Sequence, residues 1–114
     1  MDSTFKGVIA MRKRTRFGKV LERLIRAKGI PSFREFARRS GLQPASVSFY
    51  VTGRQKPRIK ATVAMARALE IPQCIIAWFA FIDKPKVRTP ESVKKAERII
   101  WDFIERWEKT MEKE

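Results

Sequence analysis

Short apolar stripes bounded by glycine or proline constrain the fold of this chain more than any other feature of its sequence. Phe17, Val20, Leu21, Leu24 and Ile25 recur at intervals of three and four residues, which is the pattern of a helix that buries one face. Shorter stripes follow, and no stretch shows the alternation that is typical of a strand. The sequence therefore predicts an all-α fold, with helices over residues 16–28, 33–40, 44–51, 60–69 and 73–82.

Capping residues predict the ends of the second and third helices. Ser32 opens the stretch SFRE, in which its hydroxyl can accept a hydrogen bond from the Glu35 amide while the Glu35 carboxylate reaches back to the Ser32 amide. Gly41 ends this helix. Pro44 opens the next helix in a first turn, where an amide hydrogen would have no partner, and Gly53 ends it.

The end of the chain predicts a linker and one longer helix. Residues 83–89 form the linker, and Thr89 then caps a helix that has Pro90 at its first position. Apolar residues three and four apart give the segment 90–114 a wide stripe that must pack against another surface. Two interpretations stay open: the helix dimerises with its twin, or it folds back over the apolar helix at 73–82. We favour oligomerisation, through Trp78, Phe79, Ile100, Phe103, Ile104 and Trp107.

Charge is distributed unevenly along the chain. The 114 residues have a formal net charge of +14, and residues 1–70 contain 17 Lys or Arg against four Asp or Glu. Residues 91–114 contain six against seven. This asymmetry predicts a basic body that binds a polyanion and a near-neutral tail with another role. The expected organisation is a basic N-terminal arm at 1–15, a domain at 16–82, the linker at 83–89 and the C-terminal helix at 90–114.

Composition disfavours several classes of function. The sequence has no histidine, which removes a common general base and metal ligand, and it shows no nucleophile–base pair or metal-binding set. The single cysteine, Cys74, lies in an apolar run and is expected to be structural. That run has nine residues, against roughly 18 for a membrane span, and the first residues have the wrong order for a secretory signal. We expect a cytoplasmic, nucleoid-associated protein with no enzymatic activity, cofactor, metal or membrane partner.

An uncharged window lies in the middle of the basic body. The twelve residues LQPASVSFYVTG, 42–53, contain no charged side chain, although arginines and lysines lie on both sides of them. On a helix, Val47 and Tyr50 point to one side of this window, whereas Ser48 and Phe49 point to the other. Two short helices joined by a tight turn have the lengths of a helix-turn-helix, whose second helix enters the DNA major groove.

Residues 17–79 resemble the lambda repressor/Cro-like helix-turn-helix family. The stretch FREFARRSGLQPASVSFYVTGRQKP, followed by ATVAMARALEIP, matches the order and spacing of that family's pattern. The most telling positions are Phe36, Ala37, Gly41, Val47, Gly53, Pro57, Ala66 and Leu69. One departure is Phe33, which stands where the family often has a polar residue that helps to clamp a phosphate. The resemblance implies a five-helix domain, here with an additional C-terminal helix, that binds operator DNA as a dimer.

The resemblance also implies roles for individual residues. Bases are contacted from the start of the third helix, by Gln43, Pro44, Ala45, Ser48 and Phe49. Cations around this helix are expected to neutralise phosphates, which gives an affinity that falls with salt. This backbone set is Arg12, Lys13, Arg14, Arg16, Arg38, Arg39, Ser46, Arg54, Lys56, Arg58 and Lys60. Because none of the base-contacting residues is an arginine, thymine methyls and DNA shape should govern sequence choice.

Three interpretations of function follow. The leading one is a transcriptional regulator, a repressor that binds a palindromic operator on double-stranded DNA as a homodimer, with residues 44–51 in the major groove. The second is an antitoxin-type protein that binds a protein partner through residues 75–111 and regulates its own promoter. The third is a non-specific nucleic-acid-binding protein. A homodimer that footprints an operator without a partner favours the first, and co-purification with a co-encoded toxin favours the second.

Overall fold

Helices form every regular element of the structure, a computed structural model that describes residues 14–82 and 90–113. Its elements are α1 (Arg16–Ala27), α2 (Phe33–Ser40), α3 (Pro44–Thr52), α4 (Ile59–Leu69), α5 (Gln73–Ala77), the π-helical turn η2 (Trp78–Ile82) and α6 (Glu91–Glu112). These two ranges contain no strand, so the all-α prediction is confirmed. The last helix was predicted to have Thr89 as its cap and Pro90 at its first position; Thr89 lies outside the described residues, and the structure instead places Pro90 at the N-cap, one residue before the helix begins.

A serine and a glycine fix the ends of α2. The Ser32 hydroxyl accepts a hydrogen bond from the Glu35 amide at 3.0 Å, as predicted, and Gly41 ends the helix with a φ of 75°. The predicted return bond is wrong, because the Glu35 carboxylate accepts hydrogen bonds from Arg38 and Arg39 instead of from the Ser32 amide. A charged guanidinium is a stronger donor to a carboxylate than a neutral amide is.

The predicted helix at 73–82 is divided into α5 and the π-helical turn η2. Trp78, Phe79 and Ala80 are all buried, although successive residues of a helix point in different directions. Two neighbours explain this burial. η2 packs against α1, and the Phe79 ring meets the Trp101 ring of α6 edge-on, with the ring centroids 5.3 Å apart.

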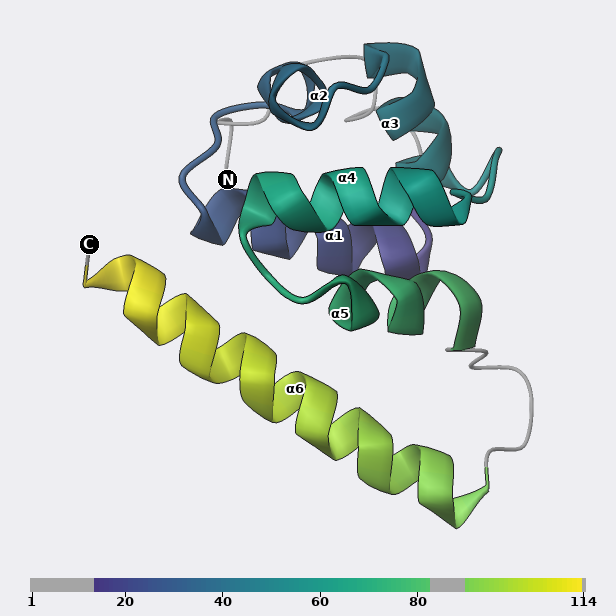
Figure 1. Ribbon diagram of the computed structural model, residues 1–114, viewed down its shortest axis with the longest axis vertical. Helices are drawn as coiled ribbons and strands as arrows, with labels where there is room; N and C mark the ends of the chain where they lie inside the picture. The colour runs from purple at the N-terminus through teal and green to yellow at the C-terminus, as the bar shows by residue number, and fades with distance from the viewer. Residues whose placement is uncertain (1–13, 83–89, 114) are drawn as a thin grey trace.

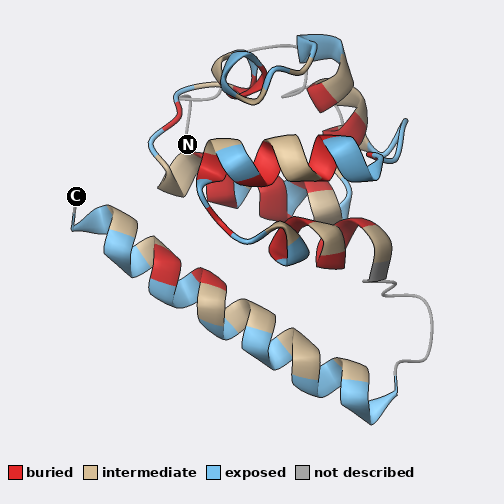
Figure 2. Ribbon diagram, in the orientation of Figure 1, coloured by how far each residue is buried: buried red, intermediate tan, exposed pale blue. Residues whose placement is uncertain are grey.

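The helices are arranged so that α2 and α3 lie at one end of the molecule and α6 at the other, with α1, α4 and α5 between them (Figure 1). The buried faces of α1, α4 and α5 meet in this middle layer (Figure 2). Leu21, Phe36 and Met65 are among the side chains with almost no exposed surface. None of the helices within 14–82 and 90–113 combines the length and the apolar character that crossing a bilayer requires.

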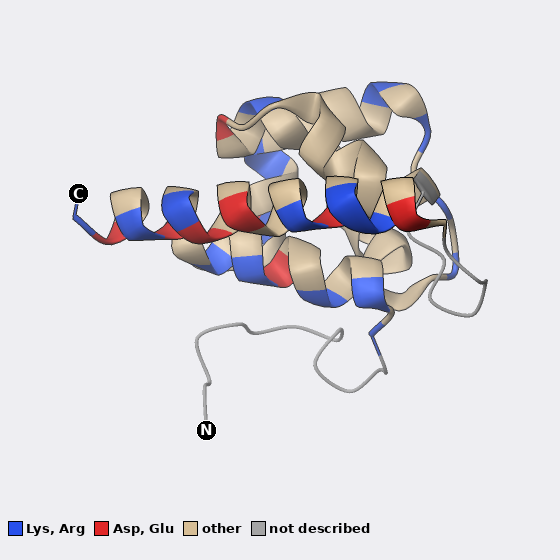
Figure 3. Cartoon of the chain, turned by 90° about the horizontal axis from the view of Figure 1, so that it is seen from below, with Lys and Arg blue, Asp and Glu red and all other residues tan. Residues whose placement is uncertain are grey.

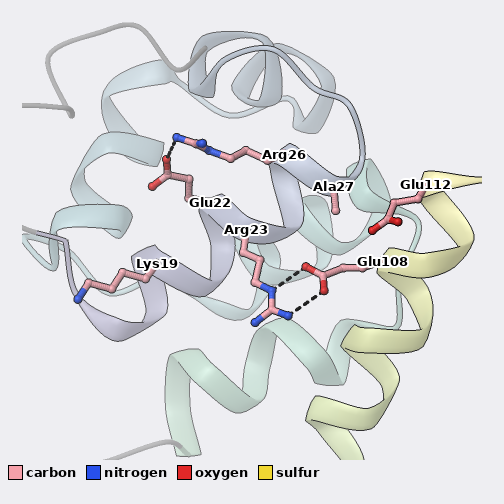
Figure 4. Close-up of a pocket in the computed structure, with 7 residues that line it drawn as sticks. All are labelled: Lys19, Glu22, Arg23, Arg26, Ala27, Glu108 and Glu112. Carbon is pink, nitrogen blue, oxygen red and sulfur yellow. Dashed lines mark hydrogen bonds and ion pairs between the residues drawn. The ribbon is translucent and has the colours of Figure 1, made fainter. Parts of the chain in front are cut away.

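Two ion pairs tie α6 to α1. Arg16 donates to Glu97 at 2.9 Å, and Arg23 donates to both carboxylate oxygens of Glu108, at 2.6 and 2.8 Å (Figure 4). The Arg23 guanidinium also lies over the Trp101 ring, 5.3 Å from its centroid. The helix therefore folds back on its own chain, which is the second of the two interpretations of the C-terminal stripe.

The residues that we predicted to dimerise lie largely inside the single chain. Trp78, Phe79, Ile104 and Trp107 are buried, and Ile100 and Phe103 are half-buried against the same core. The prediction is corrected for the four buried residues, because a side chain that is packed within one chain is withheld from a partner. The outer face of α6 instead carries interspersed cations and carboxylates (Figure 3).

Candidate nucleic-acid interface

The beginning of α1 holds the C-terminal end of α3. The amide and the hydroxyl of Thr15 both donate to the carbonyl oxygen of Val51, at 3.1 and 3.3 Å. Gly18 lies so close to α3 that a Cβ atom on it would meet this oxygen at 2.1 Å. Gly53 ends α3 with a φ of 80°, and a Cβ there would meet Cγ2 of Thr15 at 2.5 Å. Glycine at both positions therefore allows the close approach that sets where α3 lies.

The outer face of α3 carries all five residues predicted to contact bases. Exposed or half-buried side chains on this face and at its start are Gln43, Pro44, Ala45, Ser48 and Phe49. Val47, Tyr50 and Val51 are buried on the opposite side. One side of α3 is therefore exposed or half-buried and the other side is buried, as the sequence pattern predicted. Contact of the outer side with bases stays a prediction.

Phe49 and Arg54 form a pair that we did not predict. The Arg54 guanidinium lies 5.1 Å from the centroid of the Phe49 ring, within the range of a cation–π interaction. The backbone brings them together, because the Arg54 amide donates to the Phe49 carbonyl at 2.9 Å after the left-handed turn at Gly53. Such a return bond follows from a glycine-ended helix, so the signal was present in the sequence. The pair fixes a positive charge beside the outer face of α3.

Some predicted phosphate-binding cations are paired with carboxylates of other elements. The Arg14 Nε lies 2.8 Å from the Glu22 carboxylate, and its guanidinium lies 6.0 Å from the centroid of the Phe33 ring. Arg16 bonds Glu97 of α6, as described above. The sequence pattern could not indicate the pair of Arg16 with Glu97, because its two residues are 81 positions apart and only tertiary packing brings them together.

Arg38 and Arg39 share a single carboxylate within α2. Both guanidiniums donate to Glu35, and these hydrogen bonds lower the pKa of Glu35 to about 2 because they stabilise its charged form. Their charges are thus partly compensated at the surface. Two other members of the predicted backbone set, Arg12 and Lys13, lie outside the described residues.

Four cations follow α3 and have no ion pair within the described ranges. These exposed residues are Arg54, Lys56, Arg58 and Lys60, which belong to the α3–α4 loop and the first turn of α4. Ser46, also assigned to the DNA backbone, is half-buried in the first turn of α3. The structure thus brings four cations without an ion pair and the uncharged outer face of α3 into consecutive segments. This combined surface is called the α3 face below.

No group of three or more Cys, Asp or Glu residues in the ranges 14–82 and 90–113 is arranged to hold a metal ion. Comparisons with models of known families, with curated proteins and with solved structures find no match for this chain. The geometry of the α3 face is therefore the main basis for an inference about function.

Proposed function

We propose that this chain is a sequence-specific double-stranded DNA-binding regulator of transcription, with a lambda repressor/Cro-like helix-turn-helix domain. In this proposal α3 enters the major groove and two copies bind a palindromic operator as a repressor. One observation carries the proposal. The outer side of α3 is uncharged and anchored by close backbone contacts, whereas the four cations that follow it are exposed and form no ion pair within the described residues.

The uncharged side of α3 supplies groups that can discriminate between bases. Ala45 and Phe49 offer apolar contact to a thymine methyl, and the Ser48 hydroxyl can donate or accept. The side-chain amide of Gln43 can pair with adenine. No arginine projects from this helix to bind guanine in a bidentate manner. We therefore propose that the operator is recognised through thymine methyls and through DNA shape.

The cations supply affinity that does not depend on sequence. Each phosphate neutralised by Arg54, Lys56, Arg58 or Lys60 releases counterions, so log K falls with log salt by about 0.9 per contact. Four such contacts give a slope of log K against log salt of about −3.6, without any contribution from the N-terminal arm at 1–15. A slope of this size is measurable between 50 and 200 mM salt.

Selection of bound sequences from a random duplex library tests this proposal. The full chain is mixed with the library at about 0.15 M salt, where non-specific binding is weak, and the selected duplexes are competed with excess random duplex. A recurrent motif with inverted symmetry is the expected result. If no sequence survives the competition, a non-specific nucleic-acid-binding protein becomes the better interpretation.

Two sets of substitutions distinguish affinity that does not depend on sequence from preference for a particular sequence. Arg58→Ala should weaken binding to every duplex and flatten the salt dependence by about one unit of slope. Ser48→Ala combined with Phe49→Ala should instead change which motif is preferred, because these side chains face the bases. A uniform loss across all duplexes from the second set would contradict a base-contacting role for α3.

A further inference from the structure

Aromatic side chains from α1, α3 and η2 line a hollow next to the α3–α4 loop. Its volume is about 430 Å³, and its apolar lining includes Phe17, Tyr50, Pro57 and Phe79. Sites for small molecules in proteins measure about 300–1,000 Å³ and have a mostly apolar lining with a few polar groups. An apolar cavity of about 150 Å³ holds one benzene ring, so this hollow has room for a body of one or two rings.

Two polar groups that line the hollow have no partner among the described residues. Tyr50 is only 8% exposed, yet its hydroxyl forms no hydrogen bond there. Lys56 is exposed and forms no ion pair there. Arg16 also lines the hollow, but its guanidinium donates to Glu97. The hollow therefore combines a free hydroxyl and a free cation with an apolar surface.

A larger hollow, of about 530 Å³ between α1 and α6, lacks this combination (Figure 4). None of the described residues that line it is aromatic. Two of its cations are already bonded to carboxylates, Arg23 to Glu108 and Arg26 to Glu22. An anion that entered there would have to compete with these carboxylates. The hollow next to the α3–α4 loop is therefore the better site for an apolar anion.

We propose that the hollow next to the α3–α4 loop binds a small carboxylic acid with a planar apolar body. The body packs against the rings of Phe17, Tyr50 and Phe79, because aromatic edges and faces suit another ring. A carboxylate oxygen accepts a hydrogen bond from the Tyr50 hydroxyl, and its charge lies beside the Lys56 ammonium. One free cation favours a monoanion over a phosphate ester, which would bring a second charge without a partner.

Occupancy of the hollow should weaken the binding of DNA, an effect that rests on the proposed function. Lys56 is one of the cations expected to neutralise phosphates, so a carboxylate that pairs with it removes one such contact. At about 0.15 M salt, the loss of one contact makes binding about fivefold weaker and flattens the salt slope by about 0.9. Linkage requires that DNA weaken the binding of the acid by the same factor.

Cinnamate and cinnamamide test the site, because the two molecules share a planar body and one oxygen but differ in charge. Binding to the full chain without DNA is followed by nuclear magnetic resonance, through the backbone amide signals of isotopically labelled protein. The wild type should bind cinnamate with a Kd of about 1 mM, and cinnamamide about threefold more weakly. The amide signals that shift should be those around the hollow, such as Gln55 and Ala80.

Three substitutions distinguish the contributions to this binding. Tyr50→Phe keeps the buried ring and should weaken both probes about fivefold, because the lost hydroxyl donates to the oxygen that the probes share. Lys56→Gln should abolish the preference for cinnamate and leave the binding of cinnamamide unchanged. Lys60→Gln is the matched control, because Lys60 is an exposed cation of the α3 face that does not line the hollow.

The effect on DNA is measured with a duplex from the selected library, at about 0.15 M salt and constant ionic strength. Saturating cinnamate should weaken the binding of the wild type to this duplex about fivefold. Cinnamamide should change it little, and cinnamate should have little effect on Lys56→Gln, which already lacks the contact.

Several outcomes overturn the proposal. The hollow does not bind such an acid if no amide signal around it shifts, or if Tyr50→Phe binds both probes like the wild type. The same conclusion follows if Lys60→Gln weakens cinnamate as much as Lys56→Gln does. Unchanged DNA affinity under saturating cinnamate overturns the effect on DNA alone. Failure of the wild type to bind any duplex overturns the proposed function, whereas the amide signals still report on the hollow.

Discussion

Replacing Gly18 by alanine should destabilise the protein, although glycine-to-alanine changes inside helices usually stabilise by about 1 kcal/mol. The added Cβ would meet the Val51 oxygen at 2.1 Å, whereas real contacts of this kind are at least 3.0 Å long. α1 and α3 must therefore move apart by about 1 Å. Overpacking of this kind costs about 1–3 kcal/mol. The displacement also weakens the two hydrogen bonds from Thr15 to Val51, each worth about 1 kcal/mol.

The helix preference for alanine opposes the cost of overpacking and of the weakened hydrogen bonds. Together these contributions leave a net destabilisation of about 2 kcal/mol, which lowers Tm by roughly 10 °C in a domain of this size. Thermal unfolding followed by circular dichroism at 222 nm measures the shift. Lys19→Ala is the matched control, because Lys19 is exposed in the same helix and its loss should change stability by less than about 0.5 kcal/mol. A Gly18→Ala variant with unchanged or raised Tm would refute the close approach of α1 to α3.

Two further predictions concern α6 and α2. Ile104→Ala should lower the free energy of unfolding by about 2–5 kcal/mol, independently of protein concentration, because Ile104 is fully buried within one chain. Ile99→Ala is the control, because Ile99 lies on the same helix and is 70% exposed. If urea unfolding shows equal, small effects for the two variants, α6 is not packed against the rest of the chain. The hydrogen bonds from Arg38 and Arg39 lower the pKa of Glu35 from 4.5 to about 2, so their stabilising effect is present above pH 4.5 and lost as pH falls toward 2. The Tm difference between wild type and Glu35→Gln should shrink over that interval, and a difference that is constant from pH 6 to pH 2.5 would contradict this assignment.

The helices were predictable because their signals are local. Ser32, Gly41 and Gly53 act on the backbone within a few residues of themselves, and the structure places helix ends at all three. The hydrogen-bond partner of Glu35 was also a local choice, yet it was predicted wrongly. Two local patterns competed there, a capping box and the spacing of Arg38 and Arg39 three and four residues away, and the charged donors prevailed.

The position of α6 was not predictable from its own stripe. Apolar residues at three- and four-residue spacing require burial, but the same stripe serves whether the covering surface belongs to this chain or to another. The surface on which α6 packs depended on η2, whose buried side chains contact other helices on more than one side. It also depended on ion pairs such as that of Arg16 with Glu97, which are 81 residues apart. The Arg23 pair with Glu108 spans 85 residues and was equally invisible to a local pattern.

The four cations that follow α3 lie in a stretch of the sequence that has no carboxylate. No Asp or Glu occurs in residues 36–69, whereas acidic residues on either side of this stretch pair with cations of α1 and α2. The cations of the α3–α4 loop form no ion pair within the described ranges, and no carboxylate lies near them along the chain. Positive charge is compensated where α6 meets α1 and uncompensated beside α3. If a polyanion binds this protein, the uncompensated charge draws it to the end of the molecule where the uncharged side of α3 is exposed.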